Sequence, residues 1–177
     1  MNEKTKEILS NILYFAVVLL LSFMIVKFIG QRTEVIGSSM VPTLEDGNQL
    51  ITDKITYKFR EPRRFEIIVF PHEPDHEYYI KRIIGLPGET VEIDDEGTIY
   101  INGKVLEEDY GYGETRPEAL GGQVLLGDDE YFVLGDNREV SLDSRYPDVG
   151  NIPGSIIIGR AWLQLYPFDR FGLLTGK

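Results

Sequence analysis

An almost continuous apolar segment over residues 8–29 constrains the fold of this chain most. Its central part, Ile12 to Val26, is interrupted by a single serine, Ser22. A helix needs about 20 residues to cross the hydrocarbon core of a bilayer, so the segment predicts a transmembrane helix, with Lys27 reaching the interface. A cleaved secretory signal is the alternative. No small-x-small cleavage site follows Ile29 directly, which favours an uncleaved anchor.

Charged residues on the two sides of this segment do not settle its orientation. Lys4 and Lys6 precede it, whereas Lys27 and Arg32 lie at or after its end, so the positive-inside count is nearly balanced. The remainder of the chain, beyond the anchor, is long enough for one domain with a real core. The predicted division is a tail over residues 1–7, a transmembrane helix over 8–30 and a single domain over 31–177.

Composition narrows the class of function. The formal net charge is −11, which argues against nucleic acid as a partner. The chain has no cysteine, which excludes cysteine proteases, disulfide frameworks and thiolate metal sites.

After residue 35 the chain shows short strand-like segments between Gly and Pro turns, with no sustained helical period. Asn102-Gly103 is typical of a two-residue hairpin turn, and residues 107–122 predict a loop. Many short strands predict a mainly β domain of antiparallel strands, sandwich-like or barrel-like. The predicted strands cover residues 49–54, 65–70, 78–84, 90–93, 98–101, 104–106, 131–134, 155–159 and 162–165.

A candidate nucleophile lies shortly after the anchor, in the segment 36–44. Gly37, two serines and Pro42 predict a tight turn with restricted dihedral angles. Such a turn can hold a serine hydroxyl beside free backbone N–H groups, which both a nucleophile and an oxyanion site require. The alternative from these residues alone is a serine-rich turn after a membrane anchor.

Lys81 is a candidate base. In a strand, Tyr79, Lys81 and Ile83 share one face, while Tyr78, Ile80 and Arg82 share the other. A lysine among apolar neighbours can be desolvated, which lowers its pKa and lets it act as a base near neutral pH. The alternative is an edge lysine whose ammonium reaches water.

The stretch 72–76 has the letters of the zinc-protease motif H-E-x-x-H. That motif needs a helix, which Pro74 inside it and Pro71 before it disfavour, so we expect a polar loop with solvated histidines and no metal. His72 and His76 are the only histidines, so a Ser-His-Asp triad would have to use one of them, which the same argument disfavours.

A charged segment at 136–145 alternates acids and arginines. It predicts a loop that braces itself through arginine–carboxylate pairs. A weak calcium site is the alternative, but the acids lack the spacing of an EF-hand loop.

Three segments together resemble one known family, the bacterial type I signal peptidases, which are membrane-bound Ser/Lys proteases. Residues 39–44, Ser-Met-Val-Pro-Thr-Leu, resemble its nucleophile box. Residues 79–88 resemble its general-base box, and residues 135–145 its C-terminal box, in the family's order. The resemblance implies a signal-peptidase-like β domain outside the cytoplasm, a cytoplasmic N-terminus and a single-pass anchor in the cell membrane. The implied activity is removal of signal peptides from exported preproteins after a small-x-small sequence.

The resemblance also implies roles for individual residues. Ser39, rather than Ser38, is the nucleophile, and its N–H serves the oxyanion hole, while Lys81 is the base. The family's Gram-negative branch has a hydroxyl two positions before the nucleophile, where this chain has Gly37, so the second oxyanion donor stays open and the Gram-positive branch fits better. Ser141 is implied to hydrogen-bond the lysine, and Asp143 and Arg145 to form a salt-bridged brace. The loop is implied to be shaped by Asp136, Asn137 and Arg138. The shallow substrate pockets are implied to be lined by Val35, Met40, Leu44 and Ile80.

No cofactor or metal is implied. The implied partners are secretory preproteins, the lipid bilayer and the secretion translocon. Two other functions compete with this one. Self-cleaving SOS repressors use Ser/Lys in a similar β domain, but carry a DNA-binding region where this chain has an apolar span. A non-enzymatic, membrane-anchored binding domain is the other.

Overall fold

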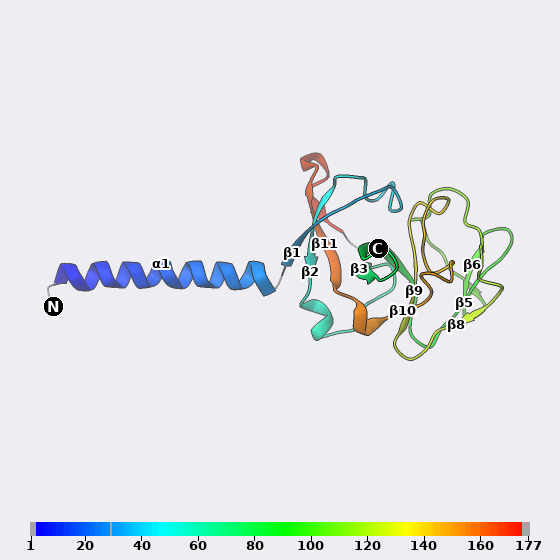
Figure 1. The fold of residues 1–177 in the computed structure, drawn as a ribbon, viewed down its shortest axis with the longest axis horizontal. Helices are drawn as coiled ribbons and strands as arrows, with labels where there is room; N and C mark the ends of the chain where they lie inside the picture. The colour runs from blue at the N-terminus through cyan, green and yellow to red at the C-terminus, as the bar shows by residue number, and fades with distance from the viewer. Residues whose placement is uncertain (1–2, 29, 175–177) are drawn as a thin grey trace.

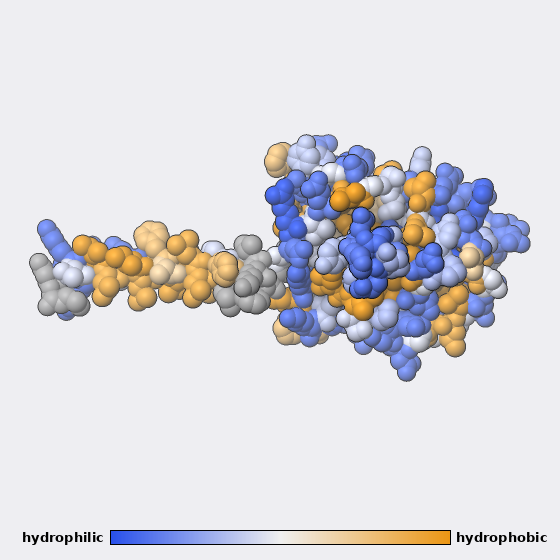
Figure 2. Space-filling view, viewed as in Figure 1, coloured by the Kyte–Doolittle hydropathy of each residue, from blue (hydrophilic) through white to orange (hydrophobic). Residues whose placement is uncertain are grey.

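The computed structural model describes the backbone of residues 3–28 and 30–174, and the side chains of 3–23 and 30–174. One long helix, α1 (Glu3–Phe28), projects from a β domain (Figure 1). The predicted helix is therefore confirmed, although it begins before residue 8. Apolar side chains run along it (Figure 2), and the stretch Glu3–Phe23 is long and apolar enough to cross a membrane, with none of it buried by the rest of the protein. The predicted position of the Lys27 side chain lies outside the described side chains, and the membrane boundaries stay predictions.

The larger sheet has eight strands, and every pairing in it is antiparallel. Its order is β1-β2-β11-β3-β4-β9-β10, with β12 added to β11. Near the end of the chain, β11 therefore inserts between two early strands. The bounds are β1 (Gly30–Glu34), β2 (Gln49–Asp53), β3 (Ile67–His72), β4 (Glu77–Gly85), β9 (Glu130–Leu134), β10 (Ile152–Pro153), β11 (Gly159–Tyr166) and β12 (Gly172–Leu173).

A smaller, four-stranded sheet has the order β7-β6-β5-β8. Its strands are β5 (Thr90–Ile93), β6 (Ile99–Ile101), β7 (Lys104–Val105) and β8 (Val124–Leu125), and Figure 1 shows β5, β6 and β8 on the side of the domain away from α1. Asn102 and Gly103 both have positive φ, 52° and 73°, as the predicted hairpin turn requires. The predicted loop at 107–122 is a loop.

The fold class is confirmed: residues 30–174 are mainly antiparallel β structure. Within that described range the helical pieces are short 3-10 turns, η1 (Thr56–Lys58), η2 (Gly154–Ile156) and η3 (Phe168–Arg170). The strand predicted at 155–159 is wrong, because η2 occupies its start and β11 begins only at Gly159. The backbone N–H groups of Gly154 and Ser155 donate to Asp129, which bends the chain despite its run of isoleucines.

The segment around His72 also departs from expectation. β3 continues through Pro71 to His72, and only residues 73–76 form the turn to β4. Pro71 is tolerated because β11 pairs with β3 only near Val69, so the missing N–H falls on an edge. His72 is only 7% exposed, so the prediction of a solvated loop histidine was wrong for it, while His76 is exposed.

One hydrophobic cluster supports the turn that carries Ser39. Met40 and Leu44, from the turn itself, are buried with Leu50, Val69 and Ile80 of the large sheet. Burial of these side chains fixes the turn against β2, β3 and β4, so the backbone around Ser39 rests on the core of the domain.

Candidate active site

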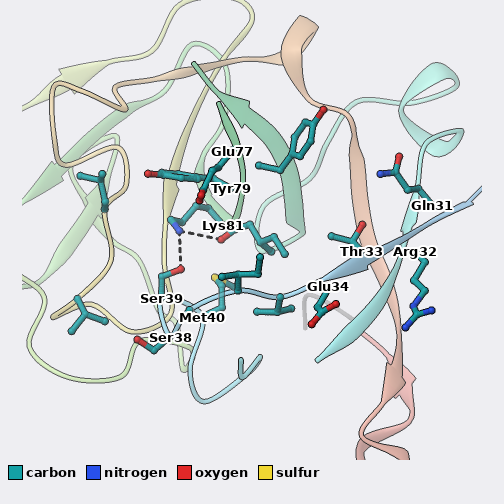
Figure 3. A pocket seen from close by; sticks show the side chains of 17 residues that line it. Gln31, Arg32, Thr33, Glu34, Ser38, Ser39, Met40, Glu77, Tyr79 and Lys81 are labelled. Atoms are coloured by element: carbon teal, nitrogen blue, oxygen red, sulfur yellow. Dashed lines mark hydrogen bonds between the residues drawn. The ribbon is translucent and has the colours of Figure 1, made fainter. Parts of the chain in front are cut away.

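Ser39 and Lys81, 42 residues apart in sequence, meet in space. Lys81 Nζ lies 2.8 Å from Ser39 Oγ, and the two side chains point toward each other in Figure 3. Lys81 lies in β4, opposite Ile68 of β3, and its side chain is 4% exposed. Nζ also donates to the carbonyl of Ile80 at 3.3 Å. The two residues singled out from the sequence are therefore within hydrogen-bond reach, as a nucleophile and its base require.

Burial changes the acidity of the lysine. Desolvation lowers the pKa of Lys81 from 10.5 to about 8, while the negative charges of Asp143 and Asp136 act in the opposite direction. The ammonium form loses hydration in this site, whereas the neutral amine loses little. A substantial fraction of Lys81 is therefore neutral near pH 8, and a neutral amine can accept the proton of Ser39.

The turn around Ser39 is fixed from both sides. Gly37 has φ +89°, a conformation that favours glycine, and its N–H donates to Asp46 Oδ1 at 2.8 Å. The carbonyl of Ser39 accepts from Asn137 N–H at 3.0 Å. Because the Gly37 N–H is engaged elsewhere and the residue has no side chain, it supplies no second donor beside Ser39 N–H in this structure.

Gly135 brings the C-terminal loop directly onto this turn. A Cβ at this position would lie 2.1 Å from Ser141 Oγ and 2.5 Å from the carbonyl oxygen of Ser39. Only glycine permits so close an approach of two backbones. Sequence reasoning did not assign Gly135 a role, although its place at the head of the third box was a usable signal.

Ser141 is buried, 2% exposed, between these segments. Its Oγ has no hydrogen-bond partner among the residues that the structure describes, so the expected hydrogen bond to Lys81 is not formed here. A buried hydroxyl without a partner is costly, which marks this oxygen as available to a group that enters the site.

The predicted brace is present as an ion pair. Arg145 Nε and Nη2 lie 2.8 and 3.0 Å from the two oxygens of Asp143, and both side chains are fully buried. Asp143 also accepts from Gly135 N–H at 3.0 Å, and Arg145 donates to the carbonyl of Arg138 at 2.8 Å. The pair therefore closes the loop on itself beneath Ser141.

A second buried pair was not predicted. Arg82 Nε and Nη2 lie 2.8 and 2.6 Å from the two oxygens of Asp136, which also accepts from Thr43. The guanidinium lies 3.7 Å from the ring centroid of Tyr110. Strand alternation had placed Arg82 on the face opposite Lys81, but the partner could not be found without the fold. Arg138, expected to shape the loop, pairs with Glu108.

A groove of about 550 Å³ runs past the Ser39–Lys81 pair. Residues 31–40 and 77–81, together with Val140 and Leu142, line it, so one wall is β1 and the other is the start of β4 (Figure 3). Of the four predicted pocket residues, Val35, Met40 and Ile80 line the groove. Leu44 does not: its N–H donates to the carbonyl of Met40, and its side chain is fully buried in the core behind.

Comparisons with known proteins give the family of this chain. Residues 8–166 match the family described as "Signal peptidase, peptidase S26". The chain is 42% identical over 154 residues to the probable signal peptidase I-2 of Synechocystis sp., covering 84% of this chain and 68% of the relative. It is 38% identical over 161 residues to signal peptidase I T of Bacillus subtilis, covering 86% and 82%.

A crystal structure of a signal peptidase I from Enterococcus faecalis is 38% identical, covers 57% of this chain and 97% of that one, and superposes with a TM-score of 0.47. The Gram-positive-like branch stays a prediction. The helix α1 fits the membrane anchor of such enzymes. The family match at this coverage removes the non-enzymatic alternative: this chain belongs to the S26 family of signal peptidases and is a peptidase of the signal peptidase I type.

Proposed function

We propose that this chain removes signal peptides from exported preproteins with a Ser39–Lys81 dyad. The observation that carries the proposal is the 2.8 Å contact between Ser39 Oγ and Lys81 Nζ, with the lysine almost fully buried. A neutral amine at hydrogen-bond distance from a hydroxyl is the arrangement that general-base activation requires.

In the first half of the reaction, Ser39 Oγ attacks the scissile carbonyl carbon while Lys81 Nζ takes the hydroxyl proton. The tetrahedral intermediate collapses as the lysine returns that proton to the leaving amine, which frees the mature protein and leaves an acyl ester on Ser39. In the second half, neutral Lys81 takes a proton from a water that attacks the ester. The signal peptide then leaves as an acid, and Ser39 regains its proton.

Charge develops on the carbonyl oxygen during both attacks. We assign Ser39 N–H as one donor to this oxygen, whereas Gly37 N–H is already bound to Asp46. No second hydrogen-bond donor to the oxyanion is assigned. Ser141, Asp143 and Arg145 support the site by holding the loop against Ser39, and Ser141 Oγ remains free for a hydrogen bond with Lys81 once substrate is bound.

The groove supports an extended peptide as substrate. Among the strands that the structure describes, β1 pairs with β2 alone, so its other edge can bond an added strand. Val35, Met40 and Ile80 give the groove a shallow apolar floor near Ser39, which suits small side chains before the cut. We place α1 across the membrane as a single span, with the tail in the cytoplasm, the β domain outside, and the lipid bilayer and the translocon as neighbours.

The test uses the two adjacent serines as a matched pair. Full-length protein in detergent is incubated with a secretory preprotein, and the product is sequenced from its N-terminus. Ser39→Ala should abolish cleavage, whereas Ser38→Ala should retain most of it. Equal losses in the two variants, or a product whose new N-terminus does not follow a small-x-small sequence, would contradict the proposal.

A further inference from the structure

A cluster at the tip of the β3–β4 hairpin has no role in the mechanism above. The imidazole of His72 stacks on the phenol ring of Tyr79, with centroids 4.2 Å apart and 17° between the planes. Tyr79 Oη donates to Asp75 Oδ2 at 2.8 Å, and Nδ1 of His72 lies 3.0 Å from Asp75 Oδ1. The turn thus fixes the Tyr79 ring at its hydroxyl end and along its face.

The same ring reaches the proposed base. Lys81 Nζ lies 4.9 Å from the ring centroid of Tyr79. The strand register explains this contact. Tyr79 and Lys81 share one face of β4. His72 pairs with Glu77, which lies on the same face, two residues before Tyr79. The phenol ring therefore contacts the stacked imidazole and also lies near the lysine amine. Tyr79 thus links His72 to Lys81 through these two contacts.

The burial of His72 is unusual for a hairpin end. The side chain is 7% exposed, yet neither ring nitrogen makes a well-aligned hydrogen bond with a described residue. An apolar side chain would avoid this cost if filling space were the only need. Its flat ring does what few other side chains can do, because it supports an aromatic neighbour face to face.

We propose that His72 and Asp75 are positioning residues that hold the Tyr79 ring over Lys81 and so keep water away from the amine. This inference rests on the proposed role of Lys81 as base. With the ring released, water would reach Nζ and the ammonium would regain hydration. The attraction of the ring for the ammonium acts the other way, but burial is the largest cause of the shift in the pKa of Lys81, so loss of the ring should raise that pKa.

The charged groups that act on this cluster are carboxylates. The negative charges of Asp143 and Asp136, in the C-terminal loop, act on Lys81. His72 faces Asp75 in the turn and Glu77 on the paired strand. The carboxyl of Asp75 has a lowered pKa: desolvation opposes the shift, while the hydrogen bond from Tyr79 and the close contact with His72 favour it. It is therefore ionised throughout the working pH range.

The test compares His72→Ala, His72→Phe and Asp75→Ala, with His76→Asn as the matched control. His76 is exposed in the same turn with φ 58°, which asparagine tolerates. The ratio kcat/KM on a peptide substrate is followed against pH. His72→Ala and Asp75→Ala should move the acid limb up by about one pH unit, a loss of about tenfold on the acid side. His72→Phe should restore the limb relative to His72→Ala, and His76→Asn should leave it in place.

A second measurement does not depend on activity. The Lys81 amine is titrated by NMR with ¹³C-labelled lysine in the Ser39→Ala protein, with Lys81→Arg used for assignment. Titration near 10.5 in this parent would defeat the proposed role of Lys81 as base. If Lys81 titrates near 8 in the Ser39→Ala parent and at the same pH after His72→Ala is added, the positioning role of His72 is contradicted, while the role of Lys81 as base is not. A uniform loss of rate with no shift of the limb would also overturn it, since that indicates general damage.

Discussion

Replacing Lys81 by methionine should make the protein more stable while removing its activity. Lys81 is 4% exposed, and desolvation lowers its pKa from 10.5 to about 8. At about 1.4 kcal/mol per pKa unit, burial of the ammonium costs the folded state about 3 kcal/mol at neutral pH. Methionine has a similar length and no charge, so it removes this cost. Loss of the contact with Ser39 offsets about 1 kcal/mol, which leaves a net gain of about 2 kcal/mol.

The sign of the effect on the free energy of unfolding, and the pH range over which it changes, follow from the difference in the pKa of Lys81 between the folded and unfolded states. The pKa is lower in the folded state, so between pH 8 and 10.5 the unfolded chain binds more protons than the folded one, and wild-type stability rises with pH there. Below pH 8 both states carry the proton and the full cost is present. The cost attributed to Lys81 should therefore fall from about 3 kcal/mol at pH 7 to about 1 kcal/mol at pH 10. Tyrosines also titrate at the upper end, but they are common to both proteins, so the difference between the two isolates the lysine.

Urea denaturation in detergent measures the free energy of unfolding of each protein. The single tryptophan, Trp162 in β11, reports it by fluorescence. The series runs from pH 7 to pH 10 for wild type and Lys81→Met, with Lys54→Met as a control at a lysine outside the site. The reasoning fails if Lys81→Met is no more stable than wild type at pH 7. It fails equally if the difference between them does not narrow as the pH rises.

Four further predictions concern the loop, the buried ion pair, metal and topology. Gly135→Ala should abolish cleavage, because its Cβ would displace Ser39 and Ser141, and near-normal kcat/KM would contradict this. Asp136→Ala should destabilise the fold by about 3–5 kcal/mol, since it leaves Arg82 charged and buried, and a loss below about 1 kcal/mol in urea would refute it. EDTA should not inhibit, because the described residues include no group of three His, Cys, Asp or Glu that could hold a metal ion, and inhibition reversed by zinc would overturn the Ser/Lys mechanism. Protease added to intact spheroplasts should degrade the β domain, and protection until lysis would reverse the proposed topology.

Local patterns predicted the fold class and most of the strands. The apolar run predicts α1, Asn102-Gly103 predicts its hairpin, and alternation predicts β4 and β5. β1 went unpredicted, because its sequence is polar and its place in the sheet comes from pairing with β2. The isoleucines at 156–158 have high strand propensity, yet contacts to Asp129 impose a turn there.

The two central site residues could be predicted because they lie in recognisable boxes. The residues that support these two are harder to predict from sequence, because each contact depends on which distant segments the fold brings together. Asp136 was expected only to shape its loop, whereas it binds Arg82, 54 residues away. Leu44 belongs to the nucleophile box but points into the core, because a turn sends neighbouring side chains in different directions.

These long-range partners also bear on the base itself. Asp136 and Asp143 are the charges that favour the ammonium form of Lys81, and they raise its pKa against the larger effect of burial. Neither carboxylate is left unpaired. Each is held instead in a two-point contact with a buried arginine, Arg82 or Arg145. The arginines therefore hold in place two acids that in turn position Gly135 and Thr43 beside the site.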